Sequence, residues 1–185
     1  MKKIPLNDII IGMNDSLAVL HMANDKRNDQ NFSTYDLYES TKNKRRWSII
    51  NPGLVMAQSY MYFVVGYESG FLDDFPSSDK TIKFINQFSF HNDEYQIKKG
   101  ENKIEAIKRH LRNSISHSRY NFFINTPSGE THKDGDLIIV FEDYYPKNNG
   151  KEHYCKFQIS FPDFANLVES TGEMTFNKTT PQHRV

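Results

Sequence analysis

Residues 103–118, KIEAIKRHLRNSISHS, decide how the rest of this chain is interpreted. Successive residues of an α-helix are rotated by about 100°, and on that wheel the three isoleucines of this stretch fall within about 40° of Leu111. Such a stripe predicts an amphipathic helix with one side against a hydrophobic core. The stripe consists of Ile104, Ile107, Leu111 and Ile115.

The other side of the same helix is polar. The angles from the centre of the stripe are about 100° for Arg112, about 200° for Asn113 and about 240° for His117. We therefore expect these three side chains to avoid the core stripe, with Arg109 between them. A solvated helix face explains Arg109 without further assumption. Asn and His are middling helix formers, so their place beside an arginine also fits a binding or catalytic site, and both interpretations stay open on these grounds.

The spacing of Arg112 and His117 bears on oligomeric state. Five residues along a helix correspond to a rise of roughly 7.5 Å and a turn of about 140°. One helix cannot easily close both side chains around a single phosphate. A second copy of the helix, facing the first across a two-fold axis, brings two arginines and two histidines into one cleft. The spacing therefore predicts a homodimer.

Several segments before this helix also have helical patterns. Ser33 and Asp36 resemble a capping box at the start of one of them. Asn51 and Pro52 suit the start of another, and the stretch after them is apolar almost all round, which predicts a buried central helix. The predicted helices are 5–30, 33–47, 52–69 and 79–88, and residues 91–102 are a connector.

The sequence changes character after Tyr120. Phe, Tyr, Ile and Val become frequent, which is typical of strands. The predicted strands are 121–126, 137–145 and 153–160, and a short helix follows from Ser160 to Glu169. The predicted fold class is α+β and mainly α. It has a helical bundle at 1–119, a small antiparallel sheet with a closing helix packed on the bundle at 120–176, and a loose tail at 177–185, together forming one compact domain.

The overall charge does not indicate a nucleic-acid-binding protein, because 23 Lys and Arg balance 23 Asp and Glu. A local basic patch is enough for binding, since clustering matters more than the total. The densest basic cluster lies in the predicted helix 33–47. Its members, Lys42, Lys44, Arg45 and Arg46, either follow a phosphate backbone or form a solvated face.

Other residue types limit the kinds of site. The single cysteine, Cys155, cannot form an intrachain disulfide or a cysteine-rich zinc site, and its strand pattern indicates a core position. The histidines have no metal-ligand spacing, so we expect neither a metal nor a cofactor. The longest apolar run, residues 54–65, is far shorter than the roughly 20 residues of a membrane span, and no signal peptide is evident. We expect a soluble, cytoplasmic protein without membrane contact.

The hexapeptide Arg112-Asn113-Ser114-Ile115-Ser116-His117, with Leu111 before it and SRYNFF from Ser118, resembles the motif of the HEPN superfamily. That motif is an Arg, a polar residue that is often Asn, and a His after four to six intervening residues on a late helix. The resemblance implies a helical bundle, a dimer and metal-independent endoribonuclease activity, with Arg112, Asn113 and His117 as catalytic residues. The sheet and helix after the motif resemble a plasmid- and phage-defence-associated bacterial branch, which implies a toxin or defence role.

These residue types suit RNA cleavage. RNA carries its own nucleophile, the 2′-hydroxyl, so an enzyme has to position the strand, move protons and stabilise charge on the phosphorane. An imidazole such as His117 exchanges protons near neutral pH. The fork of Arg112 matches phosphate oxygens, and Asn113 can orient either partner. Arg119 and Tyr120 either contact the RNA backbone and stack a base or serve only in capping and packing.

The alternative function is a non-catalytic, dimeric HEPN-like module that binds RNA, a nucleotide or a partner protein. An antitoxin or another regulatory protein is a further expected partner. In one toxin subgroup of the superfamily, a Tyr two residues after the His is nucleotidylated by such an antitoxin. Here the nearest tyrosine, Tyr120, is three residues after His117, so we do not expect that form of regulation.

Overall fold

The computed structural model describes residues 2–26, 29, 33, 51–70, 72–73, 75, 79–91, 100–125, 137–145 and 153–179. The chain divides into two compact units. Ile4–Ala57 is the N-terminal unit, and Met1–Lys3 with Gln58–Val185 is the larger unit. The predicted helix 33–47, with Lys42, Lys44, Arg45 and Arg46, lies outside the described residues except for Ser33.

The N-terminal unit is built around one amide side chain. Helix α1 (Leu6–Asp25) confirms the prediction for 5–30 within a few residues, and α3 (Pro52–Tyr60) begins at the predicted Asn-Pro signal. The Asn51 Oδ1 atom accepts hydrogen bonds from the backbone N–H of Gly53 (3.0 Å) and Leu54 (3.2 Å), which is N-capping. Its Nδ2 donates to the carbonyl of Gly12 (2.9 Å) and to the Ser16 hydroxyl, so the cap also fastens α3 to α1.

Gly53 allows this close approach of the two helices. A Cβ atom at position 53 would lie 2.7 Å from the Met13 nitrogen and 2.8 Å from the Met13 Cβ, and it would also overlap the Ile9 carbonyl. Backbone atoms cannot move aside as a side chain does. We expect Gly53→Ala to lower the free energy of unfolding by about 2 kcal/mol, measured by urea denaturation.

A matched control separates steric overlap from backbone strain. Gly100 has a φ of +86° and no heavy atom within 4 Å of a Cβ built there. Gly100→Ala should therefore show only the cost of a left-handed backbone, about 1 kcal/mol. If Gly53→Ala proves no more costly than this control, the close contact between α1 and α3 is wrong.

The larger unit contains a five-stranded antiparallel sheet in the order β1-β3-β4-β5-β2. The three central strands, β3 (Tyr120–Ile124), β4 (Leu137–Tyr145) and β5 (His153–Ser160), confirm the predicted strands, and β4 and β5 agree at both ends. The edge strands β1 (Lys2–Lys3) and β2 (Ser89–Phe90) were not predicted. Two residues are too few to show an alternating pattern.

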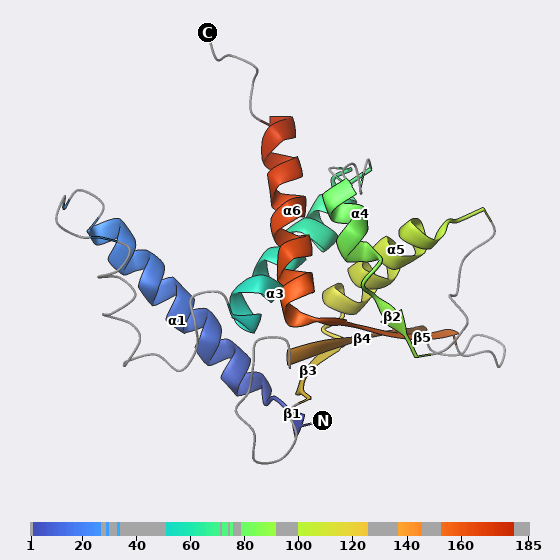
Figure 1. Ribbon diagram of the computed structural model, residues 1–185, viewed down its shortest axis with the longest axis horizontal. Helices are drawn as coiled ribbons and strands as arrows, with labels where there is room; N and C mark the ends of the chain where they lie inside the picture. Colours follow the sequence, from blue (N-terminus) through green and yellow to red (C-terminus); the bar gives the residue numbers. More distant parts are fainter. Residues whose placement is uncertain are drawn as a thin grey trace, which may run out of the picture. The chain divides into compact units, whose positions relative to one another are not determined.

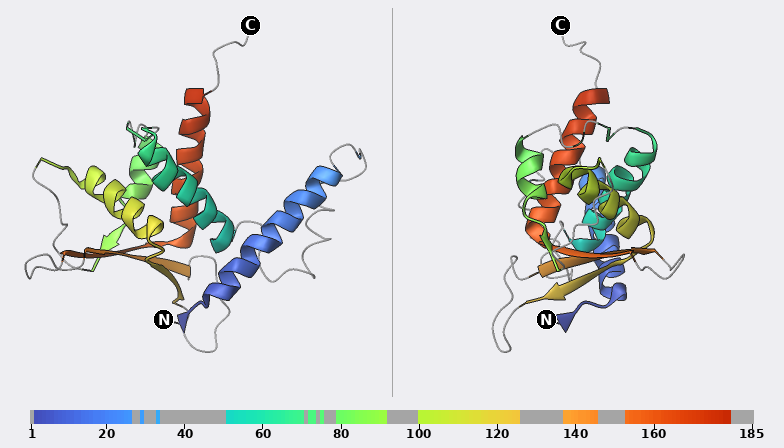
Figure 2. Two further views of the ribbon diagram at one scale, coloured as in Figure 1. Left: turned by 180° about the vertical axis from the view of Figure 1, so that it is seen from behind. Right: turned by 90° about the vertical axis from the view of Figure 1, so that its right-hand side faces the viewer.

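Helices α4 (Asp79–Ile85), α5 (Lys103–Ser116) and α6 (Phe161–Thr179) cover the same face of this sheet (Figures 1 and 2). Side chains that alternate along the strands supply the buried layer between them. The Phe141 ring stacks on Phe157 at 5.3 Å and packs against Phe164 of α6 at 5.2 Å, centroid to centroid. The fold class is therefore α+β, as predicted, with helices segregated to one side of an antiparallel sheet.

The closing helix is longer than predicted, since α6 runs to Thr179 rather than ending at Glu169. The sequence after Glu169 begins Ser-Thr-Gly, which is poor in helix formers. Packing compensates for this: Ser170 and Thr171 are buried and donate their hydroxyls to the Leu167 carbonyl (2.9 and 2.8 Å). A Cβ at Gly172 would lie 2.6 Å from the Tyr62 hydroxyl oxygen, so this glycine lets α6 lie against the helix that carries Tyr62.

The predicted central helix 52–69 is present, but only part of it is buried. After α3 it continues as a π-helical segment, η1 (Met61–Gly66), and η1 packs against α5 as expected. Phe63 and Val64 are buried. The prediction of burial all round was wrong, because part of the apolar run is exposed; the exposed residues are Tyr60, Met61, Val65 and Tyr67. Within the described ranges, no helix is long and apolar enough to cross a membrane.

Candidate functional site

Helix α5 begins with a capping box, which fixes the residue at which the helix starts. The Asn102 Oδ1 atom accepts from the backbone N–H of Ile104 (2.9 Å) and Glu105 (3.0 Å), and Glu105 accepts from the Asn102 N–H (2.9 Å). Both sets of hydrogen bonds satisfy backbone donors that a helix start leaves free. The predicted helix 103–118 is thereby confirmed, and its last helical residue is Ser116.

Burial of α5 is wider than a single stripe. The helix packs against both η1 and β4, and its buried residues are Ala106, Ile107, His110, Leu111, Asn113, Ser114 and Ile115. The expectation that Asn113 avoids the core was wrong, since it is only 5% exposed. A helical wheel with one core side could not show this, because the sheet covers a second side of the helix.

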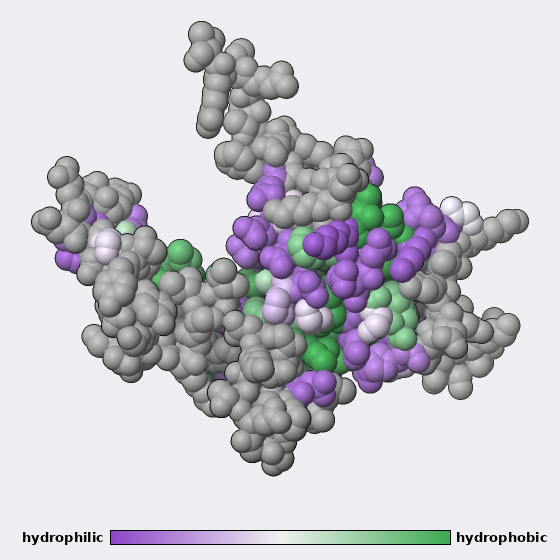
Figure 3. Space-filling model, in the orientation of Figure 1, coloured by the Kyte–Doolittle hydropathy of each residue, from purple (hydrophilic) through white to green (hydrophobic). Residues whose placement is uncertain are grey.

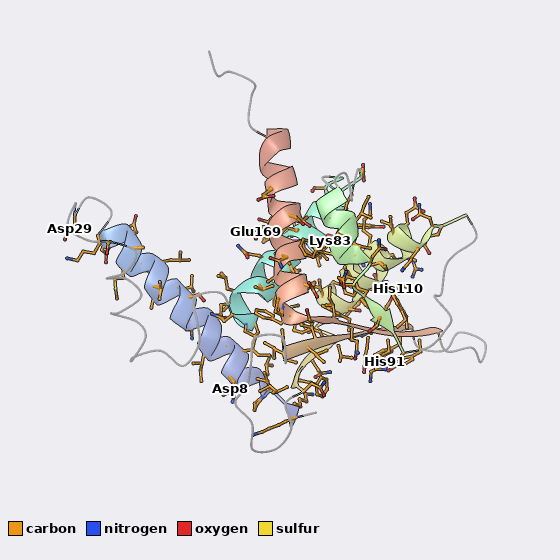
Figure 4. All side chains as sticks on the ribbon, viewed as in Figure 1. Asp8, Asp29, Lys83, His91, His110 and Glu169 are labelled. Carbon is orange, nitrogen blue, oxygen red and sulfur yellow. The ribbon has the colours of Figure 1, made fainter. Side chains whose placement is uncertain are left out.

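A buried polar chain runs from β4 to the surface through α5. Asp143 on β4 accepts two hydrogen bonds at one oxygen, Oδ2: one from the Asn113 Nδ2 atom at 3.1 Å and one from the His110 Nδ1 atom at 2.7 Å. His110, labelled in Figure 4, and Asp143 are each 2% exposed. The Asn113 Oδ1 atom in turn accepts from Arg112 Nη1 at 3.1 Å. The first two residues of the motif are therefore fixed by a strand from outside the helical bundle.

Arg112 lies at the outer end of this chain. Its Nη2 atom donates to the Glu68 Oε1 atom at 2.5 Å, and the side chains of Arg112 and Glu68 are 30% and 55% exposed. Glu68 lies two residues after the end of η1. The guanidinium therefore donates to the buried amide of Asn113 on one side and to the more exposed carboxylate of Glu68 on the other. An anion such as a phosphate could reach this guanidinium by displacing Glu68.

His117 ends the helix and is exposed. The residue after it, Ser118, has a φ of +53°. The Ser118 N–H donates to the Ile115 carbonyl (3.1 Å) and the Arg119 N–H to the Ser114 carbonyl (2.7 Å), which together form a Schellman motif. In the described part of one chain, no hydrogen bond or ion pair joins the His117 ring to Arg112 or Asn113. The structure brings Arg112 and Asn113 together and leaves His117 on the surface at the end of their helix.

Residues 11–182 match the sequence model of a protein family described as HEPN pEK499 p136. The chain belongs to this HEPN family. No curated protein and no solved structure gave a match. The family assignment confirms the superfamily suggested by the Arg-Asn-x-x-x-His motif. The match covers strands β2 to β5, all of α6 and the earlier helices except the start of α1.

Three residues predicted as weaker RNA-binding candidates have partners within the chain. They are Arg109, Arg119 and Tyr120. The Arg109 fork forms an ion pair with Glu101, with both N–O distances 2.8 Å. The Arg119 guanidinium lies 3.9 Å from the Tyr144 ring centroid and donates to the Tyr144 carbonyl at 2.6 Å. Tyr120 packs against aromatic rings of the sheet, and burial raises the pKa of its hydroxyl. These contacts correspond to the packing alternative for Arg119 and Tyr120; their RNA-binding role stays a prediction.

The sequence reasoning missed the partners of the HEPN motif, namely Glu68, His110 and Asp143. A signal for Asp143 existed in the predicted strand 137–145. Ile139 and Phe141 share one face with Asp143 at a period of two, so an acidic residue occupies an inward position. A buried carboxylate needs hydrogen-bond donors, and the nearest helix supplies them.

Cys155 is a core residue, as predicted. It pairs with Asp143 across β4 and β5 and is buried. Burial, and secondarily the nearby Asp143, raises the pKa of the thiol to about 12. The thiol therefore stays protonated and unreactive at neutral pH. Among the described residues, no three His, Cys, Asp or Glu side chains are grouped as metal ligands would be.

The positive φ of Ser118 suggests a direct test of how the HEPN motif helix ends. The left-handed region costs a residue with a Cβ atom roughly 1 kcal/mol, and glycine does not have this cost. We expect Ser118→Gly to raise the free energy of unfolding by about 1 kcal/mol, measured by thermal or urea unfolding. Ser116→Gly is the control: Ser116 is the last helical residue and has no positive φ, so glycine there should destabilise by about 0.5 kcal/mol. Destabilisation by both variants would contradict the observed backbone at Ser118.

Proposed function

We propose that this HEPN protein is a metal-independent endoribonuclease that cleaves RNA by attack of the 2′-hydroxyl on the neighbouring phosphate. The observation that carries the proposal is the fixed guanidinium of Arg112, partly exposed and aligned by Asn113, on a helix that ends in an exposed His117. A toxin or defence role in the cytoplasm, controlled by an antitoxin or another regulatory protein, belongs to the same proposal.

In this reaction Arg112 binds the scissile phosphate. Its permanent charge and fork of donors suit the oxygens that gain charge in the transition state, and the phosphate takes the place of Glu68. His117 takes the proton from the 2′-hydroxyl or gives one to the departing 5′-oxygen, and water makes the other of these two proton transfers. Asn113 is buried behind Arg112, so it orients the arginine and does not touch RNA. The products are a 2′,3′-cyclic phosphate and a 5′-hydroxyl.

The arrangement in one chain favours a site shared by two copies. His117 is separated from Arg112 by more than a helical turn, and its ring makes no described contact with the arginine. An apolar patch lies on the helix that leads to Glu68; it consists of Tyr60, Met61, Val65 and Tyr67. Exposed apolar patches commonly mark association surfaces. We propose that this patch is part of the homodimer contact that places His117 of one copy near Arg112 of the other.

The first test is cleavage itself. Wild-type protein should cleave single-stranded RNA in excess EDTA, leaving 2′,3′-cyclic phosphate ends, and should not cleave DNA of the same sequence. Arg112→Ala and His117→Ala should each lower the rate by at least about 100-fold. Their free energies of unfolding should change by no more than about 1 kcal/mol, because both side chains reach the surface.

His91→Ala is the matched control, since His91 is exposed and pairs only locally with Gln158 at 2.9 Å. It should cleave at the wild-type rate. The endoribonuclease proposal is wrong if both motif variants retain wild-type rates or if cleavage requires a divalent metal. RNA binding without any cleavage would instead support the non-catalytic module, which the pairing of Arg112 with Glu68 also favours.

The shared site makes a separate prediction about assembly. Light scattering should give twice the 21.7 kDa chain mass. Met61→Asp should yield monomers, because it places a carboxylate within the apolar patch, whereas Tyr154→Asp on β5 should remain dimeric. A mixture of Arg112→Ala and His117→Ala proteins should regain activity at least about 10-fold above either variant alone, since the mixed dimer retains one complete pair. A monomeric wild-type protein, or no recovery on mixing, would contradict a shared site.

A further inference from the structure

Asp143 is a residue of the sheet that nonetheless contacts the motif. It is on β4, it is 2% exposed, and its Oδ2 atom accepts from Asn113 at 3.1 Å and from His110 at 2.7 Å. The path from Asp143 to the guanidinium of Arg112 consists of one amide group and two hydrogen bonds. Asp143 itself cannot reach a bound phosphate, because Asn113 lies between them.

The two ends of the Asn113 amide differ chemically, so both hydrogen bonds form in only one orientation of the amide. A primary amide has a donor end and an acceptor end that are nearly equal in size. The carboxylate of Asp143 only accepts, so it selects the orientation in which Nδ2 of Asn113 faces the sheet. The acceptor Oδ1 then faces Arg112 Nη1 at 3.1 Å. With the amide reversed, its NH₂ group would face the donors of Arg112 and its carbonyl would face the carboxylate, and both hydrogen bonds would be lost.

His110 keeps the carboxylate in position. Its Nδ1–H donates to the same Oδ2 atom, which places His110 and Asn113 on one side of Asp143. Among the described residues, the other carboxylate oxygen, Oδ1, is buried and has no hydrogen-bond partner, and neither has Arg112 Nε. The connection from Asp143 to Arg112 runs through the amide of Asn113. A change at Asp143 is therefore expected to reach Arg112 through that amide.

We propose that Asp143 is a positioning residue of the RNA-binding site: it fixes the amide of Asn113 and thereby aims the guanidinium of Arg112 at the phosphate. This inference rests on the proposed function, because it assumes that Arg112 binds an RNA phosphate. It assigns the C-terminal sheet a part in the site, through a residue more than twenty positions after the motif.

The test is a double-mutant cycle on binding, which does not depend on cleavage. The probe is a 2′-O-methyl oligoribonucleotide, which lacks the attacking hydroxyl, and the readout is its dissociation constant by fluorescence anisotropy. Arg112→Ala should weaken binding about 10-fold, and Asp143→Leu, of similar size but without an acceptor, about as much. The double variant should bind no more than about twofold more weakly than Arg112→Ala alone, because Asp143 acts only through the arginine.

Conservative and distant variants separate positioning from a loss of stability. Asp143→Asn can keep an acceptor at the Oδ2 position and should bind within about threefold of wild type. Thr171→Val removes a buried hydroxyl of α6 that donates to the Leu167 carbonyl at 2.8 Å, far from the motif in sequence. It should lower the melting temperature and leave the dissociation constant unchanged. If Asp143→Leu does not fold, Asp143→Ser takes its place, being polar but too short to reach Asn113.

The outcomes distinguish this inference from the proposed function. Independent effects of Arg112→Ala and Asp143→Leu that multiply in the double variant would overturn the positioning role, as would wild-type affinity in Asp143→Leu. A wild-type protein that binds but does not cleave would overturn the nuclease proposal alone. In a protein that cleaves, Asp143→Leu should lower the rate at saturating RNA by up to about 100-fold, which a misplacement of about 1 Å can cause. A wild-type protein that does not bind the probe would overturn both.

Discussion

The hydrogen bond between Asn113 and Asp143 is the constraint on which the arrangement of the motif depends. It obliges α5 to turn a polar face toward the sheet, where apolar contacts would otherwise suffice. A buried amide and a buried carboxylate are tolerated only when they have hydrogen-bond partners, and here each is a partner of the other. The rotation of the helix about its own axis is consequently fixed, and the Arg112 side chain stays partly exposed beside Glu68. The hydrogen bond between Asn113 and Asp143 therefore contributes both to the packing of α5 on the sheet and to the geometry of the site.

The π-helical segment supplies the other boundary of the site. Backbone hydrogen bonds in a π-helix join residues five apart, whereas those in an α-helix join residues four apart. The side chains that follow a π-helical segment therefore point in directions different from those in a continuous α-helix. After η1, Glu68 reaches Arg112, while Tyr67 lies 5.5 Å below the Lys108 ammonium group. On the face shown in Figure 3, hydrophilic side chains gather over α4 and α5, with smaller apolar areas between them.

Elements that follow from local patterns were predicted from the sequence, and those that depend on tertiary contacts were not. The capping residues Asn51 and Asn102 and the alternation in β4 act over a few residues, which is why the starts of α3 and α5 and the limits of β4 agree with the expectations. The motif residues were found because their spacing is local. The burial of Asn113, however, depends on a strand some thirty residues later. The extended part of α6 likewise packs close to Tyr62, far earlier in the chain.

The contact of Gly172 with Tyr62 has an evolutionary consequence. A methyl group at position 172 would collide with the Tyr62 hydroxyl and ring carbons, so residue 172 cannot become larger while Tyr62 stays in place. In related chains a larger residue at the position of Gly172 should accompany a smaller one at the position of Tyr62. Covariation of these two positions would trace the packing of α6 on the helix before the motif through the history of the family.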